Sequence, residues 1–316
     1  MNDGVWLRVL KVKLKRAVDS SSAKEIVFGD NFPDYDLNIQ VNVYKYMSAL
    51  KDYCTIKIDN LSYSEVIQIV MGKFYSVEIV AGYRNGNQMT VFKGAVLRIN
   101  NTLLSQNRTN QIIILAGCNL IAKFSQATLN FSLQSNLNTY SAIKFITERA
   151  GVKNSSVSTQ LKKSFLNQVK TETNTAGSFL EALANNNSTY ILNSDSSDGM
   201  TFSIYDAALS NNRIIKIKNM QLIGGYPQLS KDGLTLSVLP TFNFMCGDVI
   251  KVDNSVISLQ STLSTSNLSN QPGYYLDKDG AYMIVQVDYE LTNRSSEFSC
   301  NITAKARSLI SNYIGV

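Results

Sequence analysis

Histidine is absent from this 316-residue chain. The imidazole ring is the commonest general base and a common metal ligand, so its absence excludes Ser-His-Asp and Cys-His nucleophilic sites and weighs against an enzyme. The sequence also lacks a phosphate-cradling, glycine-rich loop in front of a helix. We therefore expect no catalytic, cofactor-binding or metal-binding residues and no cofactor.

Cysteine is scarce, and its spacing is uninformative for metal binding. Cys54, Cys118, Cys246 and Cys300 lie far apart, and no Cys-x-x-Cys pair occurs. Each of the four sits in an apolar, strand-like context. This pattern predicts buried free thiols in a reducing compartment rather than disulfides.

Long apolar runs are missing as well. No stretch approaches the ~20 apolar residues that a membrane-spanning helix needs, and the basic N-terminus has no small-residue cleavage site, so it is not a signal peptide. The hydrophobic fraction of 44% and the mean hydropathy of −0.06 are those of an ordinary globular protein. We expect two or three domains and no stable membrane association.

Positive charge is unevenly distributed along the chain. Of the net charge of +6, +4 lies in residues 61–130, where six Lys and Arg face only Glu65 and Glu78. Such an excess is most often a solvated face, and the alternative is a surface that meets an acidic partner. Tyr83, Arg84, Lys93 and Arg98 are the residues that could form an aromatic and basic nucleic-acid surface, although ordinary hairpins carry the same residues.

Three glutamates and one acidic run are the remaining candidates for a catalytic or calcium-binding site. A glycosidase holds two carboxyl groups apart, with one in an apolar pocket, whereas Glu148, Glu172 and Glu181 fall on or near predicted helix surfaces. The run Asp277-Lys278-Asp279-Gly280 begins like a calcium loop but lacks the further ligands and the closing Glu. We interpret the three Glu residues as solvated and this run as a hairpin turn.

Alternation of apolar and polar residues predicts many strands in the first part of the chain. These strands cover residues 5–16, 25–28, 37–43, 53–61, 77–83, 88–93, 95–99 and 111–117. Asn85-Gly86 predicts a type I′ hairpin turn, and Gly94 a bulge. The spacing of Val66, Ile67 and Val70 predicts a short helix over 62–72. Lys11, Lys13 and Lys15 share one strand face, which is typical of a protected sheet edge or of a contact with an anionic partner.

The middle and the end of the chain differ in pattern. Helices are predicted over 139–151, with Ile143, Ile146 and Ala150 inward and Thr139 or Ser141 as cap, and over 175–184. Strands at 190–192 and 200–205 accompany them, while 155–173 is weakly patterned. Further strands cover 213–217, 234–239, 249–252, 281–291 and 297–305, with a surface loop at 258–272. The expected fold is mainly β (β+α): a first β-barrel domain over 1–130, a small α+β insert domain over 131–212 and a second β-barrel domain over 213–316.

The stretch 223–257 is the most distinctive part of the sequence. A strand buries Leu234, Leu236 and Val238, Pro240 ends it, and Phe242, Phe244 and Met245 precede a Gly247-Asp248 turn and a second strand. The order of these features resembles a segment of the baseplate hub proteins of contractile-tailed phages, which are related to the type VI secretion spike hub.

Two further places are similar to this hub family. Residues 139–151 and 177–184 have the spacing of its small insert domain, and residues 279–287 followed by 298–304 resemble its closing hairpin. The turn at 291–295 departs from the family, because a His-Gly-Asp-like turn would be expected there. This departure concerns the closing loop rather than the architecture.

The resemblance implies a structural virion protein with two similar tube-type barrels. Three copies would form a ring, a homotrimeric symmetry adaptor between the six-fold tail tube protein and the three-fold central spike protein. Other baseplate proteins would be further partners, and DNA would only pass through the lumen. Assembly would take place in the bacterial host cytoplasm, and the spike would be a separate polypeptide.

One alternative function remains open at the level of the sequence. A β-rich phage tail adhesin or glycan-binding module would need exposed aromatic residues near acidic or amide groups. Tyr274-Tyr275 beside Asp277 is the candidate for such a site. An enzyme that cleaves cell-wall polymers through Glu148 and Glu181 is the third and least favoured alternative.

Overall fold

The structure is a computed structural model. It describes residues 8–16, 25–29, 37–72, 74–84, 86–104, 109–118, 128–133, 137–152, 154–157, 159–163, 169–186, 189–193, 199–204, 213–230, 233–259 and 276–306.

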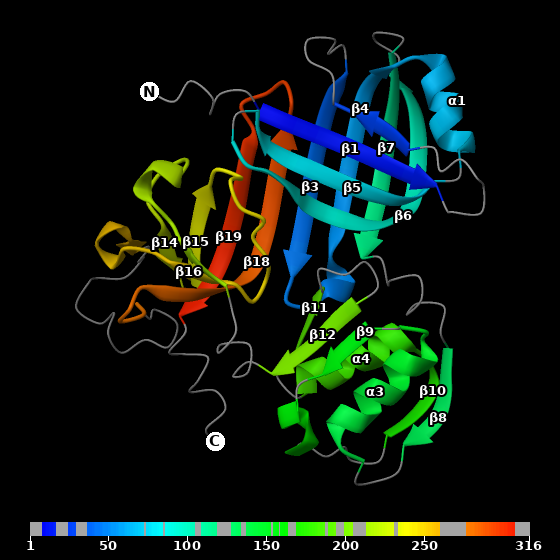
Figure 1. Ribbon diagram of the computed structural model, residues 1–316, viewed down its shortest axis with the longest axis vertical. Helices are drawn as coiled ribbons and strands as arrows, with labels where there is room; N and C mark the ends of the chain where they lie inside the picture. Colours follow the sequence, from blue (N-terminus) through cyan, green and yellow to red (C-terminus); the bar gives the residue numbers. More distant parts are fainter. Residues whose placement is uncertain are drawn as a thin grey trace.

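One 14-stranded sheet dominates the described part of the chain (Figure 1). Its N-terminal half contains β1 (Arg8–Arg16), β2 (Glu25–Phe28), β3 (Asn38–Tyr46), β4 (Tyr53–Leu61), β5 (Phe74–Tyr83), β6 (Gln88–Leu104) and β7 (Thr109–Cys118). Its C-terminal half contains β13 (Ile214–Lys216), β14 (Gln228–Ser230), β15 (Gly233–Val238), β16 (Val249–Lys251), β17 (Ser258–Leu259), β18 (Ala281–Thr292) and β19 (Phe298–Ala306). The order is β17-β14-β15-β19-β18-β3-β4-β7-β6-β5-β1-β2, and β16 pairs with both β13 and β18.

The residues between these halves form smaller elements, which lie below the large sheet in Figure 1. They comprise β8 (Thr128–Leu133) paired with β10 (Val169–Thr175), and β12 (Gly199–Ile204) between β11 (Thr189–Asn193) and β9 (Asn154–Val157). Helices α3 (Thr139–Arg149) and α4 (Ala176–Asn186) accompany them, and the short 3-10 turns are η1 (Ala49–Lys51), η2 (Thr159–Lys163), η3 (Asn219–Gln221) and η4 (Asn254–Val256). The weak pattern of 155–173 therefore concealed β9 and β10, whose polar residues gave no alternation.

The two halves share one hydrophobic core. Buried apolar residues alternate along β3, β4 and β7 in one half and along β15, β19 and the second part of β18 in the other, and all belong to the same cluster. Alternate residues of a strand point to opposite faces, so this pattern gives the large sheet one apolar inner face and one polar outer face. The predicted strands are confirmed, and the fold is mainly β.

The prediction of two separate β-barrels is not confirmed. Strand β18 pairs antiparallel with β3, so the first and last strands of the chain join one continuous sheet. Among the described residues, no ladder connects β17 to β2, and the sheet is not closed into a barrel. The two halves merge because the free edges of β3 and β18 satisfy each other's backbone groups.

Helix α1 (Tyr63–Met71) confirms the predicted short helix. The side chain of Ser62 accepts a hydrogen bond from the Glu65 amide, and the Glu65 carboxylate accepts one from the Ser62 amide, which is a complete capping box. Only Val66 and Ile69 are buried within the helix. Ile67 and Val70, whose spacing with Val66 predicted the helix, are exposed.

Helix α3 buries the predicted Ile143, Ile146 and Ala150. Its cap differs from the prediction, since the Ser141 amide donates to Asn138 Oδ1 at 2.8 Å. Asparagine is as good an N-cap as serine or threonine, and here it precedes both predicted candidates.

Gly94 does not form the predicted bulge. The register of β6 shifts instead at Val91, against β5, and at Leu97, against β7. A Cβ atom at position 94 would lie 2.2 Å from the Gly117 carbonyl oxygen and 2.6 Å from the Phe92 ring. Glycine is therefore required there for close packing. The hairpin of β5 and β6 is confirmed, while Asn85 in its turn lies outside the described residues.

The lysine face of β1 is not a sheet edge. β1 is hydrogen-bonded to β5 on one side and to β2 on the other, so β2 is the terminal strand. Lys15 Nζ lies 3.4 Å from Glu78 Oε2 and 3.9 Å from Glu25 Oε2. Lys15 therefore meets carboxylates of its own sheet.

Strand β18 changes faces along its length. Simple alternation along the strand would place Ile284 on the same side as Gln286, Asp288 and Glu290, but Ile284 is buried. The register of β18 against β19 shifts at Val285, and the extra residue of such a bulge inverts the alternation. Assigning the buried face by simple alternation of residues is therefore wrong for the first part of this strand.

Candidate functional site

The ladder between β3 and β18 is the place where the two halves meet, and we call it the seam. Gln286–Thr292 of β18 pair with Tyr46–Gln40 of β3. Asn293, just after β18, also accepts a hydrogen bond from the Ile39 amide and donates one to the Leu37 carbonyl, at 2.8 and 3.0 Å. The seam is therefore fixed by both backbone and side-chain hydrogen bonds.

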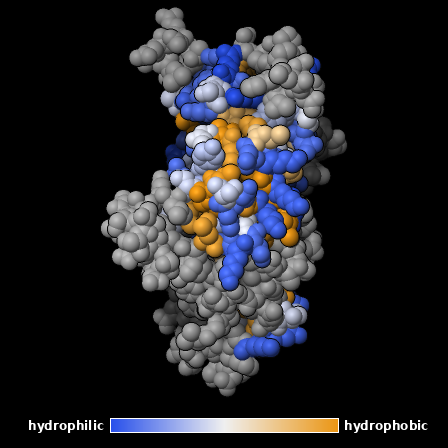
Figure 2. Space-filling model, turned by 90° about the vertical axis from the view of Figure 1, so that its left-hand side faces the viewer, coloured by the Kyte–Doolittle hydropathy of each residue, from blue (hydrophilic) through white to orange (hydrophobic). Residues whose placement is uncertain are grey.

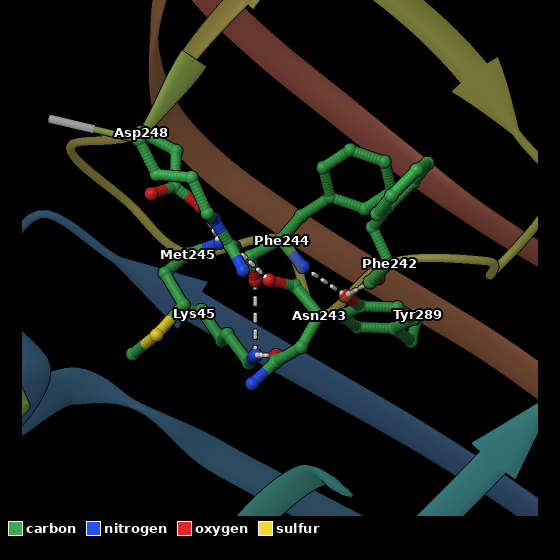
Figure 3. A network of polar contacts seen from close by, with 8 residues as sticks. Lys45, Phe242, Asn243, Phe244, Met245, Asp248 and Tyr289 are labelled. Carbon is green, nitrogen blue, oxygen red and sulfur yellow. Dashed lines mark hydrogen bonds and ion pairs between the residues drawn. The ribbon is translucent and has the colours of Figure 1, made fainter. Parts of the chain in front are cut away.

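A lysine lies on the apolar side of the seam. Lys45 follows Val41 and Val43 on the inner face of β3 and is only 7% exposed. Its ammonium group donates to Asn243 Oδ1 at 2.8 Å and to the Phe244 carbonyl at 3.0 Å (Figure 3). Both acceptors belong to residues 239–248, which we call the seam loop. This loop is the turn region of the distinctive sequence stretch.

Burial lowers the pKa of Lys45, and the nearby Asp52 carboxylate acts in the opposite direction. An unpaired buried charge is costly. Here the charge is compensated by the two loop acceptors and by the face of the Tyr289 ring, whose centroid lies 5.1 Å from Nζ. The Asp52 carboxylate is itself held in place, since it accepts a hydrogen bond from the Tyr46 amide at 2.8 Å.

Tyr289 of β18 connects the seam to the same loop. Its hydroxyl accepts a hydrogen bond from the Phe244 amide at 2.8 Å and donates one to the Phe242 carbonyl at 3.1 Å. The side chain is fully buried, and this burial raises the pKa of the phenol well above its usual value. Tyr289 therefore acts as a neutral donor and acceptor that fixes the loop backbone.

An ion pair closes the far end of the seam loop. Asp248 Oδ2 accepts hydrogen bonds from Arg213 Nη2 at 2.6 Å and from the Met245 amide at 3.1 Å. Burial raises the pKa of Asp248, and the Arg213 guanidinium opposes that shift. Gly247 makes the turn possible because its φ of 91° lies in the left-handed region. Arg213 also donates to the Asn243 carbonyl.

Three tyrosines gather on the outer face of the seam. The rings of Tyr44 and Tyr53 stack with their centroids 4.5 Å apart, and the Tyr46 ring lies 6.5 Å from that of Tyr53. In the ladder, Asp288 is opposite Tyr44. Burial raises the pKa of both Tyr44 and Tyr46. The outer face therefore carries an aromatic cluster beside carboxylates.

The Asp288 carboxylate is only partly satisfied. Its Oδ2 accepts a hydrogen bond from Gln286 Nε2 at 2.8 Å, whereas its buried Oδ1 atom has no hydrogen-bond partner. Burial raises the pKa of Asp288, the Gln286 bond opposes this, and the neighbouring Glu290 adds to it.

The residues proposed for nucleic-acid binding do not form an aromatic surface. Tyr83 is buried and packs edge-on against Phe298, with ring centroids 5.7 Å apart. Arg84, Lys93 and Arg98 remain exposed. The prediction of an exposed tyrosine is wrong because β19 of the other half covers that position.

The structure also shows where most of the acidic residues considered as catalytic or calcium-binding candidates lie. Glu148 is exposed on α3, and Glu181 on α4 accepts a hydrogen bond from Ser48 Oγ at 3.3 Å. Asp277 is a turn residue, as predicted, because its carboxylate accepts hydrogen bonds from the Asp279 and Ala281 amides at 3.0 and 3.2 Å. Tyr274, Tyr275 and the side chain of Glu172 lie outside the described residues.

The four cysteines are free and buried, which confirms that prediction. The described side chains contain no group of three His, Cys, Asp or Glu residues placed to hold a metal ion. Within the described ranges, no helix has the length and apolar character that crossing a membrane requires.

The sequence-based prediction missed the roles of Lys45 and Tyr289. A signal for the first was present, because Ile39, Val41, Val43 and Lys45 share one parity in an alternating strand. A charged residue at a core position indicates a buried partner. Nothing in the sequence identified that partner as the seam loop.

A family model described as baseplate hub gp41 matches residues 17–304. Among curated proteins, none matches the sequence. The fold is similar to the prophage MuSo2 43 kDa tail protein from Shewanella oneidensis, with a TM-score of 0.56, 7% identity and coverage of 96% of this chain and 98% of that one.

Two other solved structures have comparable similarity. The tail protein from Neisseria meningitidis MC58 gives a TM-score of 0.55 at 9% identity, over 95% of this chain and 97% of that one. A chain of the Francisella PdpA-VgrG complex gives 0.57 at 9% identity, over 96% of this chain and 58% of that one. At such low identity, these similarities show a common fold.

Proposed function

This chain belongs to the baseplate hub gp41 family, and from that premise we propose that it is the trimeric hub that joins a six-fold tail tube to a three-fold central spike. Membership of the family makes the protein a structural component of the phage tail and not an enzyme. The trimer, the tube contact and the spike contact are the parts that we add.

The arrangement of strands around the seam supports this proposal. On one side, β3 is followed by its hairpin partner β4 and then by β7, and on the other, β18 is followed by its hairpin partner β19 and then by β15. Two hairpins that meet antiparallel are approximate counterparts. Three copies would present six such hairpins, as an adaptor between six-fold and three-fold partners requires. The two halves correspond only in these hairpins. The C-terminal half also contains the parallel pairs β13–β16 and β14–β17, which have no counterpart among the described strands of the N-terminal half.

The seam also suits a mechanical role. A hub must transmit force between tube and spike without separating its two halves. The continuous backbone ladder and the Lys45 and Tyr289 contacts make the halves one hydrogen-bonded unit.

We propose that the small sheets and helices within 131–212 form a separate domain between sheet halves at 1–130 and 213–316.

We propose the tail tube protein, the central spike protein and other baseplate proteins as partners. The similar Francisella chain was solved in a complex of PdpA with VgrG, which supports a fold that works within assemblies. DNA would contact the hub only while passing through its lumen. Assembly would precede release from the bacterial host, in its cytoplasm.

The observation that carries the proposal is the family match across almost the whole chain. The test is native mass spectrometry of the full-length protein, alone and with its own phage's tube and spike proteins. We expect a species of three 35.0 kDa copies, and electron micrographs of rings with a central hole. A protein that stays monomeric with both partners present would contradict the proposal.

A glycan-binding role is the second candidate, and the outer face of the seam favours it. Stacked tyrosines beside the carboxylate of Asp288 resemble the groups that hold a sugar ring. A glycan array distinguishes the two functions. Binding to a defined glycan that is lost in Tyr44→Ala and Tyr53→Ala would support an adhesin, and an array without signal would exclude the glycans on it.

A further inference from the structure

The apolar surface of helix α1 is wider than the part that packs within the chain. Val66 and Ile69 pack into the core. The adjoining face carries Tyr63, Ile67, Val70 and Met71, which are 72%, 42%, 45% and 74% exposed. Their spacing of four, seven and eight positions from Tyr63 places them in one stripe, which we call the α1 stripe. A helix whose apolar surface is wider than its buried face leaves apolar area in contact with water, so a partner is expected to cover the stripe.

A second group of exposed apolar residues lies within residues 213–230 of the C-terminal half. Ile214, Met220 and Tyr226 are 59%, 81% and 70% exposed, and we call them the Met220 patch. The segment that carries Met220 runs along β15, because the Leu239 amide donates to the Gln221 carbonyl and the Ile223 amide to the Ser237 carbonyl.

The two surfaces lie on opposite sides of the molecule. In Figure 1, α1 is at the upper right, whereas β14 and β15 lie on the left. Figure 2 shows that left-hand side, where apolar side chains gather at mid-height among hydrophilic ones. A subunit with different apolar surfaces on opposite sides is suited to head-to-tail contacts, and such contacts close into a ring when the rotation permits.

The charges around the two surfaces are complementary. Residues 59–72, which contain the α1 stripe, carry Asp59 and Glu65 and no Lys or Arg. Residues 213–230, which contain the Met220 patch, carry no acidic residue and expose Lys216 and Lys218. A contact between two like surfaces would bring equal charges together, whereas a contact between unlike surfaces pairs opposite charges.

We propose that the α1 stripe of one copy docks on the Met220 patch of the next copy. The occupant of each surface is thus a second copy of this chain, in a head-to-tail contact. The inference rests on the proposed trimer and specifies which surfaces build it. The contact would bury the exposed aromatic and methionine side chains that are enriched at the centres of interfaces.

Cross-linking between chosen cysteines tests the pairing of the surfaces. The native cysteines are buried, so a short bis-maleimide should react with Met71→Cys and Met220→Cys. The full-length double variant is expected to form covalent dimers and trimers, while each single variant, like the unmodified protein, forms none. A single variant that cross-links as well as the double variant would show a like-to-like contact and overturn the inference.

The same experiment separates this inference from the proposed function. A trimer by native mass spectrometry whose double variant does not cross-link would overturn the surface assignment and leave the trimer standing. A monomer in the presence of tube and spike proteins would overturn both.

A pair of matched substitutions gives an independent measurement. Ile67→Asp is expected to raise the trimer dissociation constant by roughly tenfold or more, because a charge at an interface centre is desolvated without a partner. Leu97→Asp is the control, since Leu97 is similarly exposed, at 46%, but lies outside both surfaces. Equal effects of the two substitutions would contradict the assignment, and circular dichroism would verify that both variants fold.

Discussion

The ammonium group of Lys45 lies 5.1 Å from the centre of the Tyr289 ring, although the two residues belong to strands on opposite sides of the seam. The two side chains bond to the same three-residue part of the seam loop, Phe242–Phe244. The loop is therefore held by both halves of the sheet at once, and disturbing either residue should loosen it.

Lys45→Ala is expected to destabilise the protein by about 2–4 kcal/mol, because it leaves the half-buried Asn243 acceptor and the buried Phe244 acceptor without a donor and opens a cavity. Lys45→Met should cost less, since it fills the space and removes the charge that burial disfavours. Urea denaturation measures both. Lys57→Ala, on the outer side of β4, is the control and should stay within about 0.5 kcal/mol. Equal losses for the Ala and Met variants would contradict this account.

Tyr289→Phe is expected to cost about 1–3 kcal/mol, since the buried Phe244 amide loses its acceptor at 2.8 Å. The loss is local, so amide hydrogen exchange should accelerate most at Phe244 and Met245. Tyr75→Phe, at an exposed tyrosine, should leave exchange in the seam loop unchanged. If exchange accelerated evenly over the whole sheet, the Tyr289 hydroxyl would not act locally on the seam loop, and the prediction would be wrong.

Stability should fall as the pH rises above 9. Burial raises the pKa of the Cys54 thiol far above the ordinary value of 9.0, so above pH 9 the unfolded chain releases a proton that the folded chain keeps. The stabilisation is fully present below pH 9 and is lost at about 1.4 kcal/mol per pH unit as the pH rises towards the folded pKa.

Urea denaturation at pH 8, 9 and 10 under reducing conditions gives this slope. The lowered pKa of Lys45 makes the stability of the protein rise with pH and so opposes the effect of Cys54. The contribution of Cys54 is therefore read from the difference between the unmodified protein and Cys54→Ala. The variant should be less stable at every pH but lose less stability above pH 9. Identical slopes for the two proteins would refute the prediction.

Gly94→Ala should destabilise the sheet by about 2–4 kcal/mol, because its Cβ would clash with the Gly117 carbonyl at 2.2 Å. Gly151→Ala separates this clash from backbone strain, since Gly151 has a φ of 73° and nothing within 4 Å of the added Cβ. The control should cost about 1 kcal/mol. Thermal unfolding of both variants measures the difference, and a larger loss at Gly151 would contradict the packing explanation.

Local elements could be predicted from the sequence because their causes are local. Alternation located strands β3, β4, β15 and β19, and spacing located α1 and α3. The failures have local causes too: the bulge at Val285 inverted the faces of β18, and the polar β9 and β10 gave no pattern. Alternation also cannot show whether an exposed stripe, such as Ile67 and Val70, awaits a partner.

The pairing of β3 with β18 could not be predicted. Alternation tells which face of a strand is buried, but it carries no information about the neighbour at the strand's edge. Ile39 and Asn293, which bond across this region, are 254 positions apart. Because the partner was not identified, the two halves looked like separate barrels, and the acceptors of Lys45 stayed unknown.

The late position of β18 has a consequence for biosynthesis. During translation, β3 emerges first, and its partner β18 leaves the ribosome only after all the segments between the two strands have been made. Until then one edge of β3 offers unpaired amides and carbonyls beside a row of valines, which is a template for aggregation. Such long-range pairing also slows folding. The nascent chain should therefore depend on chaperones more than its small size suggests.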